Sequence, residues 1–110
     1  MMQMENMKMK NIILVCAAGM STSLLVNKMK AAAKETGKEV AIHAMPATTF
    51  AQYKEATDVL LLGPQVSYLL SEMKATYEPK GIKVDVINMT DYGMMNGKKV
   101  LEQALMMADK

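Results

Sequence analysis

The chain has 110 residues, of which 51% are apolar, and a formal net charge of +2. This length fits one compact domain with a hydrophobic core, and scattered lysines at near-neutral charge argue against a nucleic-acid partner. No apolar run approaches the ~20 residues that a membrane-spanning helix needs. We therefore expect a soluble chain that neither inserts into a membrane nor binds nucleic acid.

Cys16 is the only cysteine of the chain. A single cysteine excludes an internal disulfide, a redox thiol pair and a cysteine cluster for zinc, so we expect no metal and no cofactor. A free thiol is normal in a reducing cytoplasm, which is the expected location. Most single cysteines are small buried apolar residues, so a chemical role for Cys16 depends on its neighbours.

The chain opens with a segment that mixes methionine with polar side chains, residues 1–10, which we interpret as a disordered lead-in to a single domain over 11–110. A continuous apolar run, residues 11–16, predicts a buried strand. Apolar residues then recur at helical spacing through 21–36, and Gly37 supplies a helix stop.

The middle of the chain predicts two further strands joined by a short connection. Residues 39–45 alternate between apolar and polar, as a strand near a sheet edge does, and residues 58–62 form another buried run. The connection, 46–57, is short and predicts one brief helix that contains Phe50 and Tyr53.

The last third predicts helix, strand and helix. Pro64 can open a helix that continues to Tyr77, residues 83–88 form a fourth strand, and 98–110 carry one apolar helical face. Strands and helices thus alternate throughout the chain. This order is typical of a doubly wound α/β sandwich with right-handed crossovers, a parallel sheet having helices on both faces.

The loop after the first strand carries the chemical signal. Cys16 ends the strand, and seven small or hydroxyl-bearing residues follow it: Ala17, Ala18, Gly19, Met20, Ser21, Thr22 and Ser23. In open α/β sheets, ligands bind at the carboxyl ends of the strands. A helix N-terminus attracts anions and favours the thiolate form of a nearby cysteine. The loop therefore predicts a thiolate nucleophile beside a cradle for a phosphoryl group, with one hydroxyl capping the helix.

Three interpretations of this loop compete. In the simplest, Ser, Thr and Gly merely turn the chain and cap a helix, and Cys16 is inert in a module that binds anions or partners. A cysteine phosphatase or arsenate-reductase-like enzyme also places Cys before such a loop, but it needs Arg six residues later, where this chain has Thr22. The chain contains no arginine. Because a bidentate guanidinium is missing, a phosphocysteine should hydrolyse slowly, which suits a phosphoryl carrier.

Two segments resemble a known family. CAAGMSTSLLVNKM, which starts at Cys16, resembles the active-site loop of the lactose/cellobiose (chitobiose) type enzyme IIB components of the bacterial sugar phosphotransferase system, and LLGPQVSYLL resembles a later segment of the same family. The resemblance implies a four-stranded parallel sheet in the order 2-1-3-4. It also implies that Cys16 accepts phosphoryl from a phosphohistidine of enzyme IIA. The recipient would be a sugar, often a β-linked disaccharide such as cellobiose, chitobiose or lactose, bound to the membrane permease enzyme IIC.

The implied strand order puts further residues near Cys16. The third strand would adjoin the first, so the loop that contains Pro64 and Gln65 should lie beside the sulfur, although Gly63 and Pro64 can equally be a plain helix start. Tyr92, in the loop after the fourth strand, is a weaker candidate, since such a tyrosine more often serves packing. We interpret His43, which lies in mid-strand, as structural.

Overall fold

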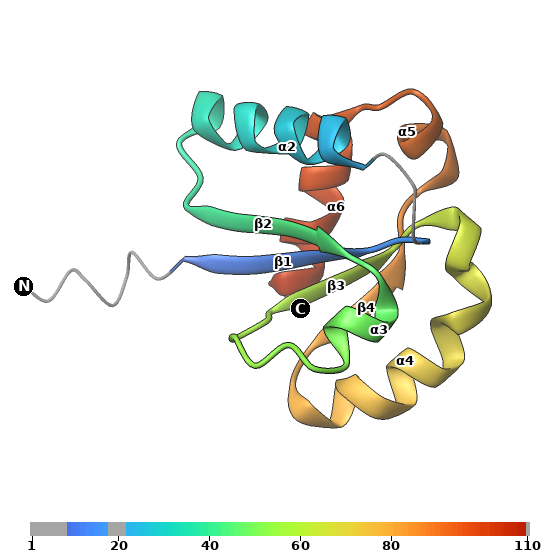
Figure 1. Ribbon diagram of the computed structural model, residues 1–110. Helices are drawn as coiled ribbons and strands as arrows, with labels where there is room; N and C mark the ends of the chain where they lie inside the picture. Colours follow the sequence, from blue (N-terminus) through green and yellow to red (C-terminus); the bar gives the residue numbers. More distant parts are fainter. Residues whose placement is uncertain (1–8, 18–21, 110) are drawn as a thin grey trace, which may run out of the picture.

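The computed structural model describes residues 9–17 and 22–109 of the chain. A parallel sheet in the order β2-β1-β3-β4 lies between two helical layers (Figure 1). Its strands are β1 (Lys10–Val15), β2 (Val40–Met45), β3 (Val59–Leu62) and β4 (Lys83–Val86). All three strand pairings are parallel. The predicted fold class and the strand order 2-1-3-4 are confirmed.

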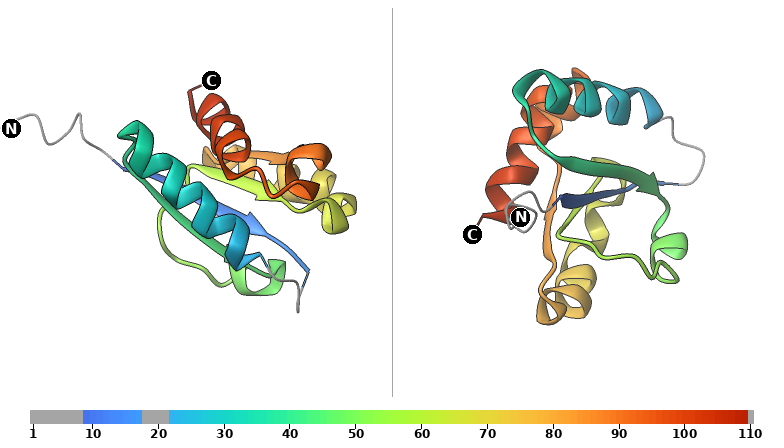
Figure 2. Two further views of the ribbon diagram at one scale, coloured as in Figure 1. Left: turned by 90° about the horizontal axis from the view of Figure 1, so that it is seen from above. Right: turned by 90° about the vertical axis from the view of Figure 1, so that its left-hand side faces the viewer.

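The helices divide between the two faces of the sheet (Figure 2). One face is covered by α2 (Ser23–Thr36) and α6 (Gly97–Ala108). The other face is covered by α3 (Ala47–Phe50), the 3₁₀ helix η1 (Pro64–Leu69) and α4 (Leu70–Tyr77). Two short elements complete the fold, η2 (Glu78–Lys80) and α5 (Met89–Gly93).

The central strands are buried on both faces, as their continuous apolar sequences predict. Ile12 and Leu14 of β1 pack into the cluster under α2 and α6. Ile13 and Val15 point the opposite way, into the cluster under α3 and α4. Because successive strand side chains point to opposite faces, one apolar run supplies two cores. The sheet is therefore anchored from both sides, and the ends of its strands are held in place.

Two predicted helices differ in detail. The segment after Pro64 begins as a 3₁₀ turn with a kink at Val66 (φ −117°, ψ 24°), and regular α-helix starts only at Leu70. The brief helix after β2 ends at Phe50, so Tyr53 lies beyond it, although its ring still stacks on Phe50 at 5.8 Å. Pro64 thus explains the irregular start of the first segment, and the shortness of the connection after β2 explains the early end of the second.

Sequence reasoning missed the helix α5 and placed Tyr92 in a loop, which is wrong. The side chain of Asn88 caps α5 by accepting a hydrogen bond from the Asp91 amide at 3.1 Å. Gln103 of α6 fixes the same turn, donating to the Val86 carbonyl at 2.9 Å and accepting from the Asn88 amide at 3.1 Å. Tyr92 is half-buried and packs against the cluster under α2 and α6.

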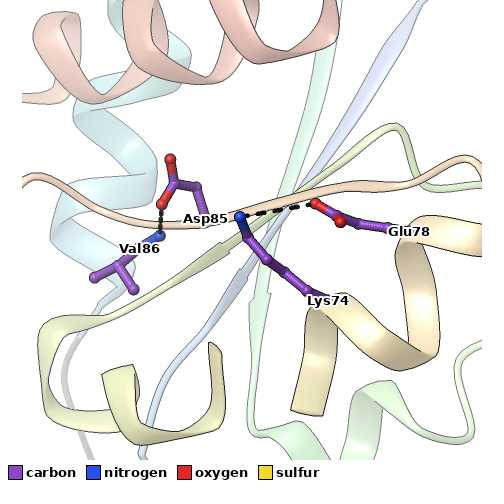
Figure 3. A network of polar contacts seen from close by, with 4 residues as sticks. All are labelled: Lys74, Glu78, Asp85 and Val86. Carbon is purple, nitrogen blue, oxygen red and sulfur yellow. Dashed lines mark hydrogen bonds and ion pairs between the residues drawn. The ribbon is translucent and has the colours of Figure 1, made fainter. Parts of the chain in front are cut away.

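The polar contacts beside β4 are mostly exposed (Figure 3). Lys74 and Glu78 form an ion pair at 4.0 Å within one helical face, with side chains 44% and 47% exposed. Such exposed pairs contribute little to stability. The Asp85 carboxylate accepts a hydrogen bond from the Val86 amide at 2.7 Å, which satisfies a main-chain donor on an edge strand of the sheet.

Gly97 allows α2 and α6 to cross closely. A Cβ atom at this position would lie 2.5 Å from the Lys28 carbonyl carbon and 2.7 Å from the Met29 amide nitrogen. Both are backbone atoms of α2, so they cannot rotate away from the added methyl group. The crossing fixes the first turns of α2 above the sheet.

We predict that Gly97→Ala lowers the free energy of unfolding by about 1–3 kcal/mol, because the two helices must separate to admit the methyl group. Gly93→Ala is the matched control, since a Cβ there meets nothing within 4 Å. Chemical denaturation of both variants measures the difference. Equal stability of the two variants would show that the crossing is not tight.

Candidate active site

Cys16 is held at the carboxyl edge of the sheet by its own main chain. Its amide donates to the Met45 carbonyl of β2 at 3.2 Å, and the Gly63 amide donates to the Val15 carbonyl at 2.8 Å. The end of β1 is therefore tied to both neighbouring strands. Cys16 is 8% exposed and belongs to neither of the two apolar clusters. Cys16 is therefore a buried residue at the end of the sheet.

Thr22 provides the polar contact of the sulfur. It is buried, and its Oγ1 lies 3.5 Å from Cys16 Sγ. Thr22 also occupies the N-cap position of α2, yet its side chain makes no capping hydrogen bond. The prediction that a loop hydroxyl caps the helix is therefore wrong for Thr22. The hydroxyl turns to the thiol instead, where it can donate a hydrogen bond to the thiolate form.

The N-terminal end of α2 adds a positive potential at this place. The helix has 14 residues and no acidic residue in its first turn. Its first amides have no partner inside the helix and carry partial positive charge. Because Thr22 leaves the cap position without a side-chain acceptor, this charge is not offset locally by the residues that the structure describes. The arrangement favours an anion between the helix end and Cys16.

The rest of the predicted phosphoryl-binding loop is only partly covered by the structure. Ser23 is exposed as the first residue of α2, and Ala17 is half-buried against the cluster under α3 and α4. The remaining predicted loop residues lie outside the described part of the chain: Ala18, Gly19, Met20 and Ser21.

The loop after β3 approaches Cys16 from the other side. A Cβ atom built on Gly63 would lie 3.3 Å from Gln65 Oε1 and 3.9 Å from the Cα atom of Cys16. Gln65 thus folds back over Gly63, the residue that also adjoins the Cys16 backbone. Pro64 is the first residue of η1, which agrees with the interpretation of Gly63 and Pro64 as a helix start. The loop therefore combines a helix start with a polar group at the site.

Sequence reasoning missed a set of exposed apolar side chains on the elements that start near this edge. Each lies shortly after the end of a strand or in the first turn of α2, and all are at least half exposed: Leu24, Tyr68, Met89 and Met94. Position after a strand end is the signal that could have found them. Exposed apolar groups around a site are typical of surfaces that meet other proteins.

His43 lies outside the core. It borders a groove together with Thr22 and Ser23, and it is exposed on β2. Side chains alternate along a strand, and Ile42 and Ala44 pack under α2 whereas Met45 packs on the opposite face, so the His43 side chain points away from α2. His43 lies in mid-strand as expected, and its structural role stays a prediction.

The described residues contain neither a metal cluster nor a membrane-spanning helix. Within 9–17 and 22–109, no three His, Cys, Asp or Glu side chains gather to hold a metal ion. In the same ranges, no helix is both long and apolar enough to cross a membrane.

The parallel sheet, the cysteine at the end of its first strand and the uncapped helix beside it define a small α/β domain suited to hold an anion next to a thiol. The sequence profile of the PTS system lactose/cellobiose-specific IIB subunit matches residues 11–103. The chain therefore belongs to this family of IIB subunits, and it is a phosphotransferase component of a sugar phosphotransferase system.

Relatives of the chain differ in the sugar that their names give. The oligo-beta-mannoside-specific EIIB component of Bacillus subtilis is 46% identical over 88% of this chain and 94% of its own length. The galactose-specific EIIB component of Lactococcus lactis is 50% identical over 86% and 93%. The solution structure of a cellobiose-specific IIB component from Borrelia burgdorferi superposes with a TM-score of 0.76 at 39% identity, over 93% of this chain and 94% of that one.

We predict that Thr22→Val slows alkylation of Cys16 by iodoacetamide about two- to tenfold at fixed pH, the effect of losing one hydrogen bond to the thiolate. The substitution keeps the size of the side chain and removes no cap. Mass spectrometry follows the reaction, and Ser23→Ala is the control because that side chain is exposed. An unchanged alkylation rate in Thr22→Val would mean that the hydroxyl does not stabilise the thiolate.

Proposed function

We propose that Cys16 is a phosphoryl carrier, charged by a phosphohistidine of enzyme IIA and discharged to a sugar bound by enzyme IIC. The observation that carries the proposal is the position of the sulfur. It lies 3.5 Å from a buried hydroxyl, at the carboxyl edge of a parallel sheet and beside an uncapped helix end. Family membership over residues 11–103 supports the same chemistry.

In the charging step, the Cys16 thiolate attacks the phosphorus of the donor's phosphohistidine in line with the bond that breaks. The sulfur–phosphorus bond forms and the nitrogen–phosphorus bond breaks, and the electron pair of the broken bond returns to the imidazole ring. In the transition state, negative charge spreads over the three equatorial oxygens of the phosphoryl group. Hydrogen-bond donors positioned around these oxygens therefore supply most of the catalysis.

The donors come from both sides of the sulfur. The Thr22 hydroxyl lies at the sulfur on the side of α2, and we propose that the Gln65 amide, which folds over Gly63, supplies a donor from the other side. The loop residues Ala17 to Ser23 complete the proposed cradle with their main-chain amides, which small side chains leave accessible to a tetrahedral anion. This set needs no metal ion.

In the discharging step, a sugar hydroxyl attacks the same phosphorus from the opposite direction. The oxygen–phosphorus bond forms, the sulfur–phosphorus bond breaks, and the sulfur leaves as a thiolate while the hydroxyl proton passes to a base of the permease or to water. Relatives named for oligo-beta-mannosides and for galactose support a carbohydrate acceptor. We propose a β-linked disaccharide as the sugar class.

The two partners place the protein in the cell. Enzyme IIC is a membrane permease, so discharge takes place at the inner face of the cell membrane, where a cytoplasmic carrier docks transiently. Both partners must reach one sulfur in turn. Short-lived contacts over a modest surface fit this requirement better than a permanent interface does.

We predict that mixing the chain with phosphorylated enzyme IIA adds the mass of one phosphoryl group, and that Cys16→Ser abolishes the addition. A serine hydroxyl remains protonated and does not attack at neutral pH. Intact-mass analysis measures the change, and unphosphorylated enzyme IIA is the control. The modified chain should persist for much longer than a phosphatase intermediate. Rapid release of inorganic phosphate would support the phosphatase interpretation instead.

We predict that Gln65→Leu slows this charging step about ten- to hundredfold, because a hydrogen bond to a charged oxygen contributes about 1.5–3 kcal/mol. Stopped-flow quenching followed by mass analysis gives the rate. Ser67→Ala, an exposed substitution in the same 3₁₀ helix, is the control and should transfer at the wild-type rate. Equal rates in the two variants would remove Gln65 from the proposed cradle.

A further inference from the structure

A groove of about 380 Å³ opens directly beside the proposed phosphoryl site. It lies between the first turns of α2 and the edge strand β2, which run side by side at the border of the sheet (Figures 1 and 2). Its near end is Thr22, whose hydroxyl lies 3.5 Å from the sulfur of Cys16. Whatever occupies the groove therefore ends next to the transferring group.

The groove carries positive charge and no negative charge. Its lining includes Lys30 as the cationic side chain, with Asn27 and Ser23 as polar neighbours, and it includes no Asp or Glu. The nearest carboxylate along α2 is Glu35, beyond the groove. An anionic occupant gains from this lining, whereas a neutral sugar gains little.

The free border of β2 adds main-chain groups to the groove. In the described sheet, β2 pairs only with β1, so its outer border has no partner strand, and three of its residues line the groove. Open strand borders accept extended chain segments from other proteins. The groove thus combines a cationic side chain with an open strand border, a combination that suits a carboxylate-bearing peptide segment.

We propose that this groove docks an acidic segment of the phosphoryl donor, enzyme IIA; the inference rests on the function proposed above. The change in charge at Cys16 during the reaction favours the phosphoryl donor as the occupant of the groove. Before transfer, the groove and Cys16 are most attractive to an acidic protein that brings a phosphoryl dianion. After transfer, the dianion resides on Cys16 and offsets the positive charge of the groove, so the donor is released.

An acidic acceptor would bind best before Cys16 is phosphorylated, when the groove is most positive. At that stage the carrier has no phosphoryl group to transfer. Thr22 lines the groove and its hydroxyl lies 3.5 Å from the Cys16 sulfur, so a dianion on that sulfur lies at the end of the groove.

The test compares two lysines of one helix. Lys30→Glu reverses a charge in the groove, whereas Lys28→Glu makes the same change in net charge outside the groove lining. Residues two apart on a helix do not share a face. We expect Lys30→Glu to lower kcat/KM for charging by phosphorylated enzyme IIA about tenfold at low salt, mostly through KM. Lys28→Glu should stay within about twofold of the wild-type protein.

Two further readouts separate the outcomes. Added salt should reduce the wild-type rate towards that of Lys30→Glu, since screening removes the attraction. Sugar-dependent discharge of phosphorylated Lys30→Glu to enzyme IIC should match wild type, and slower discharge with normal charging would overturn the proposal in favour of the acceptor. Equal charging rates for Lys30→Glu and Lys28→Glu would refute the groove alone, whereas failure of wild type to take up phosphoryl would refute the proposed function.

Discussion

The main-chain hydrogen bonds at the carboxyl edge of the sheet hold the whole site together. The amide of Cys16 bonds to β2, and the carbonyl of Val15 receives the amide of Gly63 after β3. Because the strands are parallel and adjacent, the chain leaves the sheet at neighbouring points of one edge. The sulfur, the end of α2 and the Gly63 turn, which is distant in sequence, therefore lie together at that edge.

The two apolar clusters keep that edge rigid. Burial of β1 on both faces leaves its end little freedom, and the tight crossing of α2 and α6 at Gly97 fixes the helix end near the sulfur. Gln103 also locks the turn before α5 through two hydrogen bonds. Precise placement matters because donors act on a phosphoryl group only at hydrogen-bond distance. The packing on both sides of the sheet therefore serves the chemistry at its end.

Much of this architecture could be predicted from the residues alone, and the failures have physical causes. Apolar runs such as Ile12–Val15 indicate strands buried on both faces, and Gly37 ends a helix with φ of 72°. Helix α5 was missed because five residues stabilised by an Asn88 cap carry no apolar period. One loop hydroxyl was expected to cap α2, but that of Thr22 turns to the Cys16 sulfur, which arrives from the preceding strand and is not visible to local propensity. The groove at Lys30 and His43 needs tertiary structure to bring α2 and β2 together.

A carrier faces opposite demands on the same sulfur. It must attract a phosphoryl dianion strongly enough to accept it, yet hold it loosely enough to pass it on. This chain has no arginine, so attraction close to the sulfur comes from neutral groups: the Thr22 hydroxyl, amides and a helix end. Such groups stabilise charge without the bidentate grip of a guanidinium. Full cationic charge lies in the groove of Lys30. In the proposed docking, this charge attracts the approaching donor protein, and the neutral groups around the sulfur leave the phosphoryl group free to depart.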